Sequence, residues 1–499
     1  MKIFLGNAPW SKEGNKEGNK EGNKEKGNKD YFGVRAGSRW PHFEHRTSPY
    51  MPFPFFIAYA AALLKKNGFN VFLIDAIAER ISQKEYFNRM TEFSPDVVVH
   101  EVATASIKTD IDQAGRVKEL LPDAKIIFCG AHHGMYDPKF LDEHRYVDYV
   151  CEGEFEFTLL ELAQKLKDRL PLEGVEGLLY RGADGSIKNP RRPLGKLDDL
   201  PWPAREYLPM KNYWDNPGGI PAPSLQIHTS RGCPFTCSFC VWPQIMYGGN
   251  KYRVREPKDV VDEIEHCVNE YGIKSFYFDD DTFNIGKKRI LALCDELIGR
   301  GLALPWAAMA RADTADREML ERMKAAGLAS IKYGVESADQ EMLDNSGKRL
   351  KLDVAVKTIG YTKELGIKCH LTFTFGLPGE TRETAQKTLD LVDRLNPDTL
   401  QFSIVTPFPG SRLYREMEEK GYLLSDNFDD YDGSNKAVIR TDALSAKDLE
   451  DVLCKANEHW MGRTFRKKIL NNKLFYIKEA IKNPALAVRT LQRLFITAK

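Results

Sequence analysis

Three cysteines in one short loop are the residues of this chain best suited to do chemistry. Cys233, Cys237 and Cys240 have the spacing C-x3-C-x2-C and follow an expected strand at residues 225–228. Their thiolates suit zinc or an iron–sulfur cluster, and both usually take four ligands. The next Cys or His after the loop is His266, so a fourth protein ligand is missing. We therefore predict a [4Fe-4S] cluster with one iron open to a non-protein ligand. A structural zinc knuckle is the alternative, and it needs a distant fourth ligand.

The sequence of this loop resembles that of the radical S-adenosylmethionine (SAM) superfamily. It reads RGCPFTCSFC, with the aromatic Phe239 directly before the last cysteine. The resemblance implies that the amino and carboxylate groups of SAM chelate the open iron. One electron from an external donor of the flavodoxin or ferredoxin type then cleaves the sulfonium. The products are methionine and a 5′-deoxyadenosyl radical that removes hydrogen from an unactivated carbon. The protein holds the cluster, orients SAM and excludes water.

The overall composition is that of a globular protein with more than one domain. The 499 residues suffice for two or three domains of ordinary size. With 72 basic and 71 acidic residues, no global field favours nucleic acid or an acidic membrane surface. No apolar run reaches the length of a transmembrane span. Six further cysteines are scattered in apolar or helical surroundings, and together with an oxygen-sensitive cluster they predict a cytoplasmic location.

Strand and helix alternate over the first third of the chain. We expect strands at 2–9, 70–76, 96–102, 125–130 and 147–151, and helices at 56–66, 81–93, 110–121 and 155–167. This pattern predicts a doubly wound (Rossmann-like) parallel sheet whose ligands bind outside the carboxyl ends of the strands. No G-x-G-x-x-G follows any of these strands, which argues against a nicotinamide dinucleotide. A charged Lys-Glu-Gly-Asn repeat at 11–30 is expected to be a solvated loop.

This α/β domain, placed directly before a radical SAM core, resembles the cobalamin-binding domain of the B12-dependent radical SAM family. The resemblance is carried by the Asn-Ala-Pro strand end, the Ala-Tyr-Ala-Ala-Ala-Leu-Leu helix, the Gly-Ala-His turn and the Cys-Glu-Gly-Glu segment. It implies cobalamin contacts at Asn7, Gly130, His132, Glu152 and Gly153. The D-x-H-x-x-G box that supplies a cobalt ligand in other B12 proteins is absent, as is common in this family. We therefore interpret His132 as a loop residue and not as a cobalt ligand.

Six further strand–helix units follow the linker. Their expected strands are 225–228, 275–278, 306–309, 330–333, 369–375 and 399–405. Six parallel strands are too few to close an eight-stranded barrel, so we expect an open (β/α)6 barrel, as the superfamily resemblance also implies. In such barrels the site lies at the carboxyl ends of the strands.

Polar residues at these strand ends match the positions of SAM contacts in the superfamily. Arg311 can grip a carboxylate by two hydrogen bonds, and Glu336 can accept from a ribose hydroxyl or an ammonium. Gly376 lets the backbone approach the nucleoside, and Phe239 offers a stacking face for adenine. The alternative for Arg311 is a salt bridge at the barrel rim with Asp313 or Glu336.

An acidic triplet follows the second barrel strand. Asp279 is the first residue of this triplet. At this position other family members carry a Gly-Gly-Glu-type motif that contacts the amino group of the methionine part of SAM. We predict a SAM contact at Asp279. The alternative is a divalent metal ion bound by the triplet.

We divide the chain into a cobalamin-binding domain (1–170), a linker (171–215), a radical SAM partial barrel (216–425) and a mostly helical extension (426–499). An Asp-Gly pair at 184–185 predicts a hairpin in the linker. The irregular segment at 426–439 is expected to reach over the barrel mouth and contact substrate. The basic, amphipathic helix at 486–496 is interpreted as a docking helix, with peripheral membrane contact as the alternative.

Together these features predict a cobalamin-dependent radical SAM enzyme that acts on a small-molecule or lipid-like substrate. We favour C-methylation over cyclisation or rearrangement, the chemistry of members that resemble the porphyrin-ester cyclase. A tRNA-modifying methylthiotransferase would need three more N-terminal cysteines and a basic RNA-binding domain, and neither is found in the sequence. A non-catalytic cobalamin- or metal-binding protein is the remaining alternative, and it would not cleave SAM.

Overall fold

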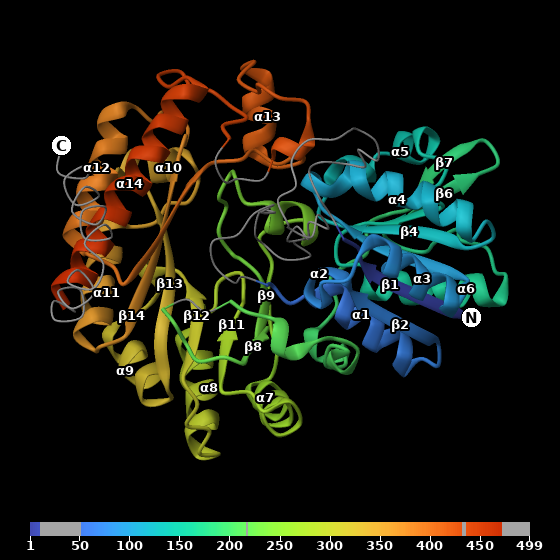
Figure 1. The fold of residues 1–499 in the computed structure, drawn as a ribbon, viewed down its shortest axis with the longest axis horizontal. Coiled ribbons are helices and arrows are strands. Elements are labelled where there is room, and N and C mark those ends of the chain that lie inside the picture. Colours follow the sequence, from blue (N-terminus) through green and yellow to red (C-terminus); the bar gives the residue numbers. More distant parts are fainter. Residues whose placement is uncertain (10–50, 216–217, 432–435, 472–499) are drawn as a thin grey trace, which may run out of the picture.

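The computed structural model describes residues 1–9, 51–215, 218–431 and 436–471. The repeat at 11–30 and the basic helix at 486–496 lie outside these residues. Among the described residues, no helix is long and apolar enough to cross a bilayer. The two sheets stand side by side, with the first sheet and its helices in blue and teal and the second in green to orange (Figure 1).

The first sheet has seven strands in the order β2-β1-β3-β4-β5-β6-β7. The first five are parallel: β1 Lys2–Asn7, β2 Asn70–Asp75, β3 Val97–Val102, β4 Lys125–Gly130 and β5 Tyr149–Cys151. The helices between them are α1 Phe55–Lys66, α2 Ala76–Glu79, α3 Gln83–Phe93, α4 Ile107–Leu120, α5 Pro138–Glu143 and α6 Glu156–Asp168. All six residues of the inner strand β3 are buried, so both faces of the sheet are covered. The predicted doubly wound parallel sheet is confirmed.

A hairpin extends this sheet beyond the part that the sequence predicted. β6 (Leu178–Gly182) and β7 (Gly185–Lys188) flank the Asp-Gly turn, and β6 pairs antiparallel with β5. β5 would otherwise be an edge strand with unpaired backbone groups, and the hairpin covers it. The sheet therefore continues into the segment that the sequence analysis assigns to the linker.

The strand order also locates the ligand edge of this sheet. The chain places β2 on one side of β1 and β3 on the other, so the direction of winding reverses between β1 and β3. In open parallel sheets, ligands bind outside the carboxyl ends of the strands at such a reversal. Here that edge includes Asn7, the last residue of β1, and Thr104 after β3.

The second sheet is the predicted open (β/α)6 barrel, which is confirmed. Its parallel strands are β8 Ser224–Ile227, β11 Ser275–Phe278, β12 Trp306–Ala310, β13 Leu328–Glu336, β14 Lys368–Phe375 and β15 Thr399–Ile404. They lie in chain order, with β8 and β15 at the two edges. The helices are α7 Pro257–Tyr271, α8 Lys287–Gly299, α9 Arg317–Ala325, α10 Gln340–Asn345, α11 Leu352–Glu364 and α12 Arg382–Leu395. All of them except the short α10 cover the outer face of the curved sheet (Figure 1).

Smaller elements complete the barrel part. β9 (Ser230–Gly232) and β10 (Tyr252–Val254) form an antiparallel pair beside the cysteine loop. α13 (Arg412–Glu419) follows the last strand, and the long helix α14 (Ala446–Asn471) lies along the barrel near α11 and α12 (Figure 1).

One hydrophobic core joins the two sheets. The core cluster contains residues of both, such as Leu5 of β1, Val99 of β3 and Leu225 of β8. Phe55 of α1 stacks on His228 with ring centroids 3.6 Å apart, and Phe56 stacks on Trp242 at 5.4 Å. A shared apolar core fixes the position of one sheet relative to the other, unlike the polar interfaces of domains that move freely.

Candidate active site

The cysteine loop begins at the carboxyl end of the first barrel strand. Gly232, directly before Cys233, has φ +92°, and a Cβ there would lie 1.8 Å from the carbonyl oxygen of Lys251. The Gly232 N–H donates to the Asp281 carboxylate at 2.8 Å, and the Tyr247 hydroxyl donates to the same oxygen at 2.9 Å. The backbone that enters the loop is therefore held by β10 on one side and by the acidic triplet on the other.

The three thiols lie close together and are only partly exposed. Burial raises the pKa of all three, and for Cys240 the charges of Cys237 and Cys233 raise it further. The described residues hold no group of three His, Cys, Asp or Glu placed to bind a single metal ion. In a [4Fe-4S] cluster each cysteine binds a different iron, so its thiols need not converge on one point. A set of three neighbouring thiols in one loop fits this cluster.

Two of the three acidic residues support the cysteine loop. The Asp280 carboxylate accepts from the backbone N–H of Thr229 at 2.7 Å and from the Ser230 hydroxyl at 2.6 Å. Asp281 accepts from Gly232, as described above. These contacts join the end of β11 to the residues that lead into the loop, which disfavours the alternative of a divalent metal bound by the triplet. Asp279 is buried at the end of β11, and its contact with SAM stays a prediction.

Arg311 forms the salt bridge that the sequence left as its alternative. Its Nε and Nη2 donate to the two oxygens of Asp313 at 2.6 and 3.0 Å, and its Nη1 donates to the Lys348 carbonyl at 2.8 Å. The guanidinium also stacks on the Phe235 ring of the cysteine loop, 3.7 Å from its centroid. Arg311 therefore holds the loop in this structure, and a SAM carboxylate could replace Asp313 only if that salt bridge opened.

Glu336 has a partner that the sequence analysis missed. Its carboxylate accepts from the Thr374 hydroxyl at 2.9 Å and from Lys348 Nζ at 3.2 Å. Lys348 is 8% exposed. Burial lowers the pKa of Lys348, but the charges of Glu336 and Cys237 outweigh burial, so the pKa is raised and the ammonium is retained. Lys348 follows α10 in a loop without a recognised motif, so only the fold brings it to the cluster thiol.

The other two predicted SAM residues lie at the same rim. Gly376, after β14, has φ +89°, which favours glycine, and its N–H donates to the Glu380 carboxylate. Phe239 is partly exposed and packs against the main core. Their contacts with SAM stay predictions.

The acidity of Glu380 gives a testable dependence of stability on pH. Burial raises its pKa from 4.5 to about 7, against hydrogen bonds from the backbone of Gly376 and Leu377. The folded chain thus binds this proton more tightly than the unfolded chain, so wild-type stability falls as pH rises through this range and levels off above it. Glu380→Gln removes the titration. We expect the variant to gain up to about 3 kcal/mol relative to wild type between pH 4.5 and 8.

Urea unfolding at a series of pH values measures this difference. The exposed Glu419→Gln variant is the control, and its curve should follow wild type. Parallel pH profiles for wild type and Glu380→Gln would show that the buried carboxyl does not titrate in this range.

The cobalamin residues predicted from the sequence lie at the carboxyl edge of the first sheet. Gly130 has φ +111°, and a Cβ there would lie 2.4 Å from the Val102 carbonyl oxygen. His132 is buried, and its Nδ1 lies 3.3 Å from the Thr104 hydroxyl. Burial lowers the pKa of His132 to about 3, so the ring is neutral. Its contact with cobalamin stays a prediction.

The remaining three residues of this edge take part in local bonds. The Asn7 amide donates to Asp75 at 3.0 Å, and Asp75 also accepts from the Tyr213 hydroxyl at 2.9 Å. Glu152 pairs with Lys188 and Arg191, and the Gly153 N–H donates to the Tyr136 hydroxyl at 3.1 Å. A Cβ at Gly153 (φ +71°) would lie 2.9 Å from the Met246 carbonyl oxygen, so this glycine is where the two parts of the chain approach closely.

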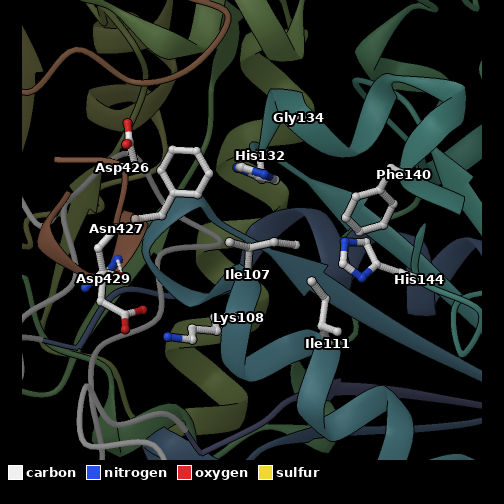
Figure 2. Close-up of a pocket in the computed structure, with 11 residues that line it drawn as sticks. Ile107, Lys108, Ile111, His132, Gly134, Phe140, His144, Asp426, Asn427 and Asp429 are labelled. Atoms are coloured by element: carbon white, nitrogen blue, oxygen red, sulfur yellow. Dashed lines mark hydrogen bonds between the residues drawn. The ribbon is translucent and has the colours of Figure 1, made fainter. Parts of the chain in front are cut away.

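A pocket of about 360 Å³ opens beside His132. Figure 2 shows side chains of the first sheet domain on one side and residues 426–429 on the other. The Phe428 ring meets the His132 ring edge to face, with centroids 5.2 Å apart. The sequence predicted that this segment reaches over the barrel mouth. The structure places Phe428 against the sheet domain, beside Ile107 and Ile111, and also against the core shared with the barrel, and contact of this segment with substrate stays a prediction.

A buried ion pair fixes the cysteine loop to the sheet domain. Arg231 Nη1 lies 2.7 Å from the Glu156 carboxylate, and both side chains are about 2% exposed. The guanidinium also covers the rings of Phe56 and Tyr59, 4.4 and 4.8 Å from their centroids. Glu154 pairs with Arg253 of β10. The carboxyl edges of the two sheets are thus held against each other.

Comparison with known proteins agrees with this arrangement. The family model for the radical SAM superfamily matches residues 227–392, and that for the B12 binding domain matches residues 46–163. An uncharacterised methyltransferase of Pyrococcus horikoshii is 30% identical over 434 residues, which are 86% of this chain and 92% of that protein. The chain belongs to the B12-binding radical SAM family. The family predicted from the sequence is confirmed, and the family models name the predicted ligands SAM and B12.

Two further proteins are also similar to this chain. The anaerobic magnesium-protoporphyrin IX monomethyl ester cyclase of Cereibacter sphaeroides is 30% identical over 88% of this chain and 71% of its own length. Among solved structures, the radical SAM methyltransferase TsrM from Kitasatospora setae has a TM-score of 0.60, with 22% identity over 72% of each chain. At 22% identity, the similarity to TsrM shows a common fold.

Gly232→Ala tests how tightly the cysteine loop is held. The added Cβ would collide with the Lys251 carbonyl, and β9–β10 pairing prevents that backbone from moving away. The positive φ adds strain. We expect a loss of about 2 kcal/mol or more in unfolding free energy, and at least a several-fold loss of iron per chain after anaerobic reconstitution.

Gly272→Ala is the matched control, since Gly272 also has positive φ (+65°) but no atom within 4 Å of its added Cβ. Because an alanine at this left-handed φ costs about 1 kcal/mol, the Gly272→Ala variant should lose about that much stability and keep its iron. Equal iron content in the two variants would show that the entry to the loop is not constrained.

Proposed function

We propose that this chain is a cobalamin-dependent radical SAM methyltransferase that acts on an unactivated carbon of a small molecule. The observation that carries the proposal is the apposition of two sites. The three-thiol loop at the carboxyl rim of the open barrel is held against the carboxyl edge of the B12-binding sheet by the pair of Arg231 and Glu156. The methyltransferase from P. horikoshii, similar over 92% of its length, supports methylation.

The cofactors supply the reactive chemistry: the cluster with SAM provides a radical that abstracts hydrogen, and cobalamin carries the methyl group. Cys233, Cys237 and Cys240 would hold the cluster. The buried pair of Lys348 and Glu336 matches the two charges on the methionine end of SAM, with Lys348 facing the carboxylate and Glu336 the ammonium.

Other residues orient the nucleoside and exclude water. We keep Phe239, Asp279 and Gly376 as SAM contacts, because they lie at the rim around the cysteine loop. Arg311 acts on the loop through Phe235. The shared apolar core beneath the loop keeps water away from the reacting groups.

The carboxyl edge of the first sheet would hold cobalamin through Asn7, Gly130, His132, Glu152 and Gly153. At Gly130 and Gly153 a Cβ would collide with neighbouring protein atoms, so these two glycines allow the chain segments of this edge to pack closely. An external flavodoxin or ferredoxin would deliver the electron. The oxygen-sensitive cluster and the unpaired cysteines favour the cytoplasm.

Products formed from SAM distinguish methylation from cyclisation. The anaerobically reconstituted full chain is incubated with SAM, dithionite and added cobalamin, and the products are separated by chromatography. Methyl transfer through cobalamin yields S-adenosylhomocysteine that depends on cobalamin, together with 5′-deoxyadenosine from reductive cleavage. Formation of 5′-deoxyadenosine without S-adenosylhomocysteine would favour cyclisation or rearrangement, as in the cyclase relative. Formation of neither product would favour a non-catalytic binding protein.

A further inference from the structure

One of the three thiols of the cysteine loop has a side-chain partner that the proposed function does not use. The Thr282 hydroxyl oxygen lies 3.3 Å from Cys233 Sγ, within hydrogen-bonding distance. Thr282 follows the acidic triplet after β11 and is 6% exposed. Burial raises the pKa of Cys233, and hydrogen bonds from Thr282 and from the backbone of Phe235 oppose this rise. The hydroxyl therefore favours the thiolate form of this cysteine.

A second thiol of the loop is influenced by different groups. Burial raises the pKa of Cys237, and the charges of Lys348 and Arg311 oppose this rise. Different groups thus act on different sulfurs. A substitution at Thr282 changes the surroundings of Cys233 and leaves the two cations in place.

The hydroxyl and the sulfur are held together by the backbones that carry them. The Gly232 N–H donates to the Asp281 carboxylate at 2.8 Å, and the next residue after each of these is Cys233 or Thr282. The Tyr252 hydroxyl donates to the Thr282 carbonyl at 3.4 Å. A side chain branched at Cβ has few rotamers open to it. The contact between hydroxyl and sulfur is therefore built into the fold.

The rest of the cysteine loop is also fixed by hydrogen bonds. The Gln244 amide donates, at 2.7 to 3.2 Å, to three carbonyls of the loop, those of Cys237, Ser238 and Cys240. The oxygen of the same amide accepts from the Arg412 N–H at 2.7 Å, at the start of α13. A loop that is held in this way is ordered before a cluster binds. We therefore expect Cys233 to stay beside Thr282 when the cluster is present.

The ionisation of Cys233 decides which of the two groups is the donor. A cysteine binds a metal ion as its thiolate, which has no hydrogen to donate. In this structure the Thr282 hydroxyl donates to the Asp281 carbonyl at 2.7 Å. A charged acceptor forms a hydrogen bond about twice as strong as a neutral one does. Once Cys233 is a thiolate, the hydrogen of Thr282 therefore favours the sulfur over the carbonyl.

The strength of this hydrogen bond affects how easily the cluster is reduced. Reduction adds one electron, so the cluster and its sulfurs become more negative and accept hydrogen bonds more strongly. Hydrogen bonds to the sulfurs are among the factors that set the potential of such clusters. A donor at Cys233 stabilises the reduced form more than the oxidised form, and it raises the reduction potential. The electron comes from the external flavodoxin or ferredoxin, and the hydrogen stays bonded to Thr282 throughout.

We propose that Thr282 sets the reduction potential of the cluster by donating its hydroxyl hydrogen to the sulfur of Cys233. Thr282 is a positioning residue, since it acts on the cluster through this cysteine. The inference rests on the proposed function, because the cluster must accept an electron before it can cleave SAM. Without the hydrogen bond, a smaller fraction of the cluster would be reduced at a given potential of the electron donor.

A redox titration of the anaerobically reconstituted full chain tests the proposal, followed by electron paramagnetic resonance without SAM or cobalamin. Thr282→Val keeps the branched shape and removes the hydroxyl. At the potential that half reduces the wild-type cluster, the ratio of reduced to oxidised cluster in this variant should be about fivefold lower, which is a midpoint about 40 mV lower. Thr282→Ser keeps the hydroxyl and should stay near the wild-type midpoint. Thr314→Val is the matched control, because Thr314 lies at the same rim but its hydroxyl donates to the Arg311 carbonyl at 2.9 Å.

Iron analysis shows whether each variant holds its cluster. Thr282→Ala removes the hydroxyl without adding bulk, and it should lower the midpoint as Thr282→Val does. Equal midpoints for wild type and these two variants would overturn the proposal, and so would a shift in Thr282→Ser as large as that in Thr282→Val. Loss of iron from both the valine and the alanine variant would overturn it as well, since the hydroxyl would then serve to assemble the cluster. A wild-type chain without any cluster signal would instead contradict the proposed function itself, so the two failures can be told apart.

Discussion

Cys240→Ala is expected to abolish reductive cleavage of SAM while the chain stays folded. Each of the three thiols would bind a different iron, so removal of one leaves the cluster with two protein ligands. Cys240 is partly exposed, and the substitution removes one sulfur from a loop outside the main core. We expect the rate of 5′-deoxyadenosine formation to fall at least ~1000-fold, as for groups that act as a unit. Iron and sulfide analysis should show that the cluster is lost.

The control for this prediction is Cys454→Ala, since Cys454 is an exposed thiol on α14 far along the chain from the loop. It should keep full iron content and activity. A Cys240→Ala protein that retains both its iron and its SAM cleavage would show that the cluster has another protein ligand, and the assignment of the loop would be wrong.

Arg231→Met is expected to have the largest effect on stability. It leaves the Glu156 carboxylate in the interface between the two sheets without its cation, 2.7 Å away in the wild-type structure. Burial raises the pKa of Glu156, and Arg231 opposes this rise. Loss of one partner of a buried pair costs about 3–5 kcal/mol. The double variant Arg231→Met, Glu156→Met should be more stable than the single variant, because no charge remains buried.

Urea unfolding measures this difference, with Arg322→Met as the matched control. Arg322 pairs with Asp295 on the surface, where both side chains are about half exposed, and such pairs contribute about 1 kcal/mol or less. Similar losses for Arg231→Met and Arg322→Met would mean that the ion pair does not hold the two sheets together. The apolar core around Phe55 and Phe56 would then be the main connection.

The sequence predicts the regular parts of this fold well, because each parallel strand is a continuous apolar run that ends in polar residues. β3 and β11 are fully buried along their length, and their ends fall where the pattern places them. The hairpin of β6 and β7 was recognised, but its pairing with β5 was not. That pairing depends on a free sheet edge, which exists only after the sheet has formed.

The interaction partners of the side chains at the site were harder to predict than the positions of those residues in the fold. The motif places Arg311 at the rim, yet the choice between SAM and Asp313 depends on local geometry, and Asp313 lies only two residues away. Lys348 lies beside Glu336 because the loop after α10 folds back to the rim, and its sequence carries no signal. Phe428 likewise meets His132 across nearly 300 residues of chain, a distance over which periodicity gives no information.

Electron paramagnetic resonance of the reduced, anaerobically reconstituted protein tests the central claim most directly. The account predicts about four iron and four sulfide per chain and a cluster signal that changes when SAM is added, because SAM binds the iron that lacks a cysteine. Zinc in place of iron, or a cluster signal that SAM leaves unchanged, would contradict a cluster held by three cysteines with one open iron.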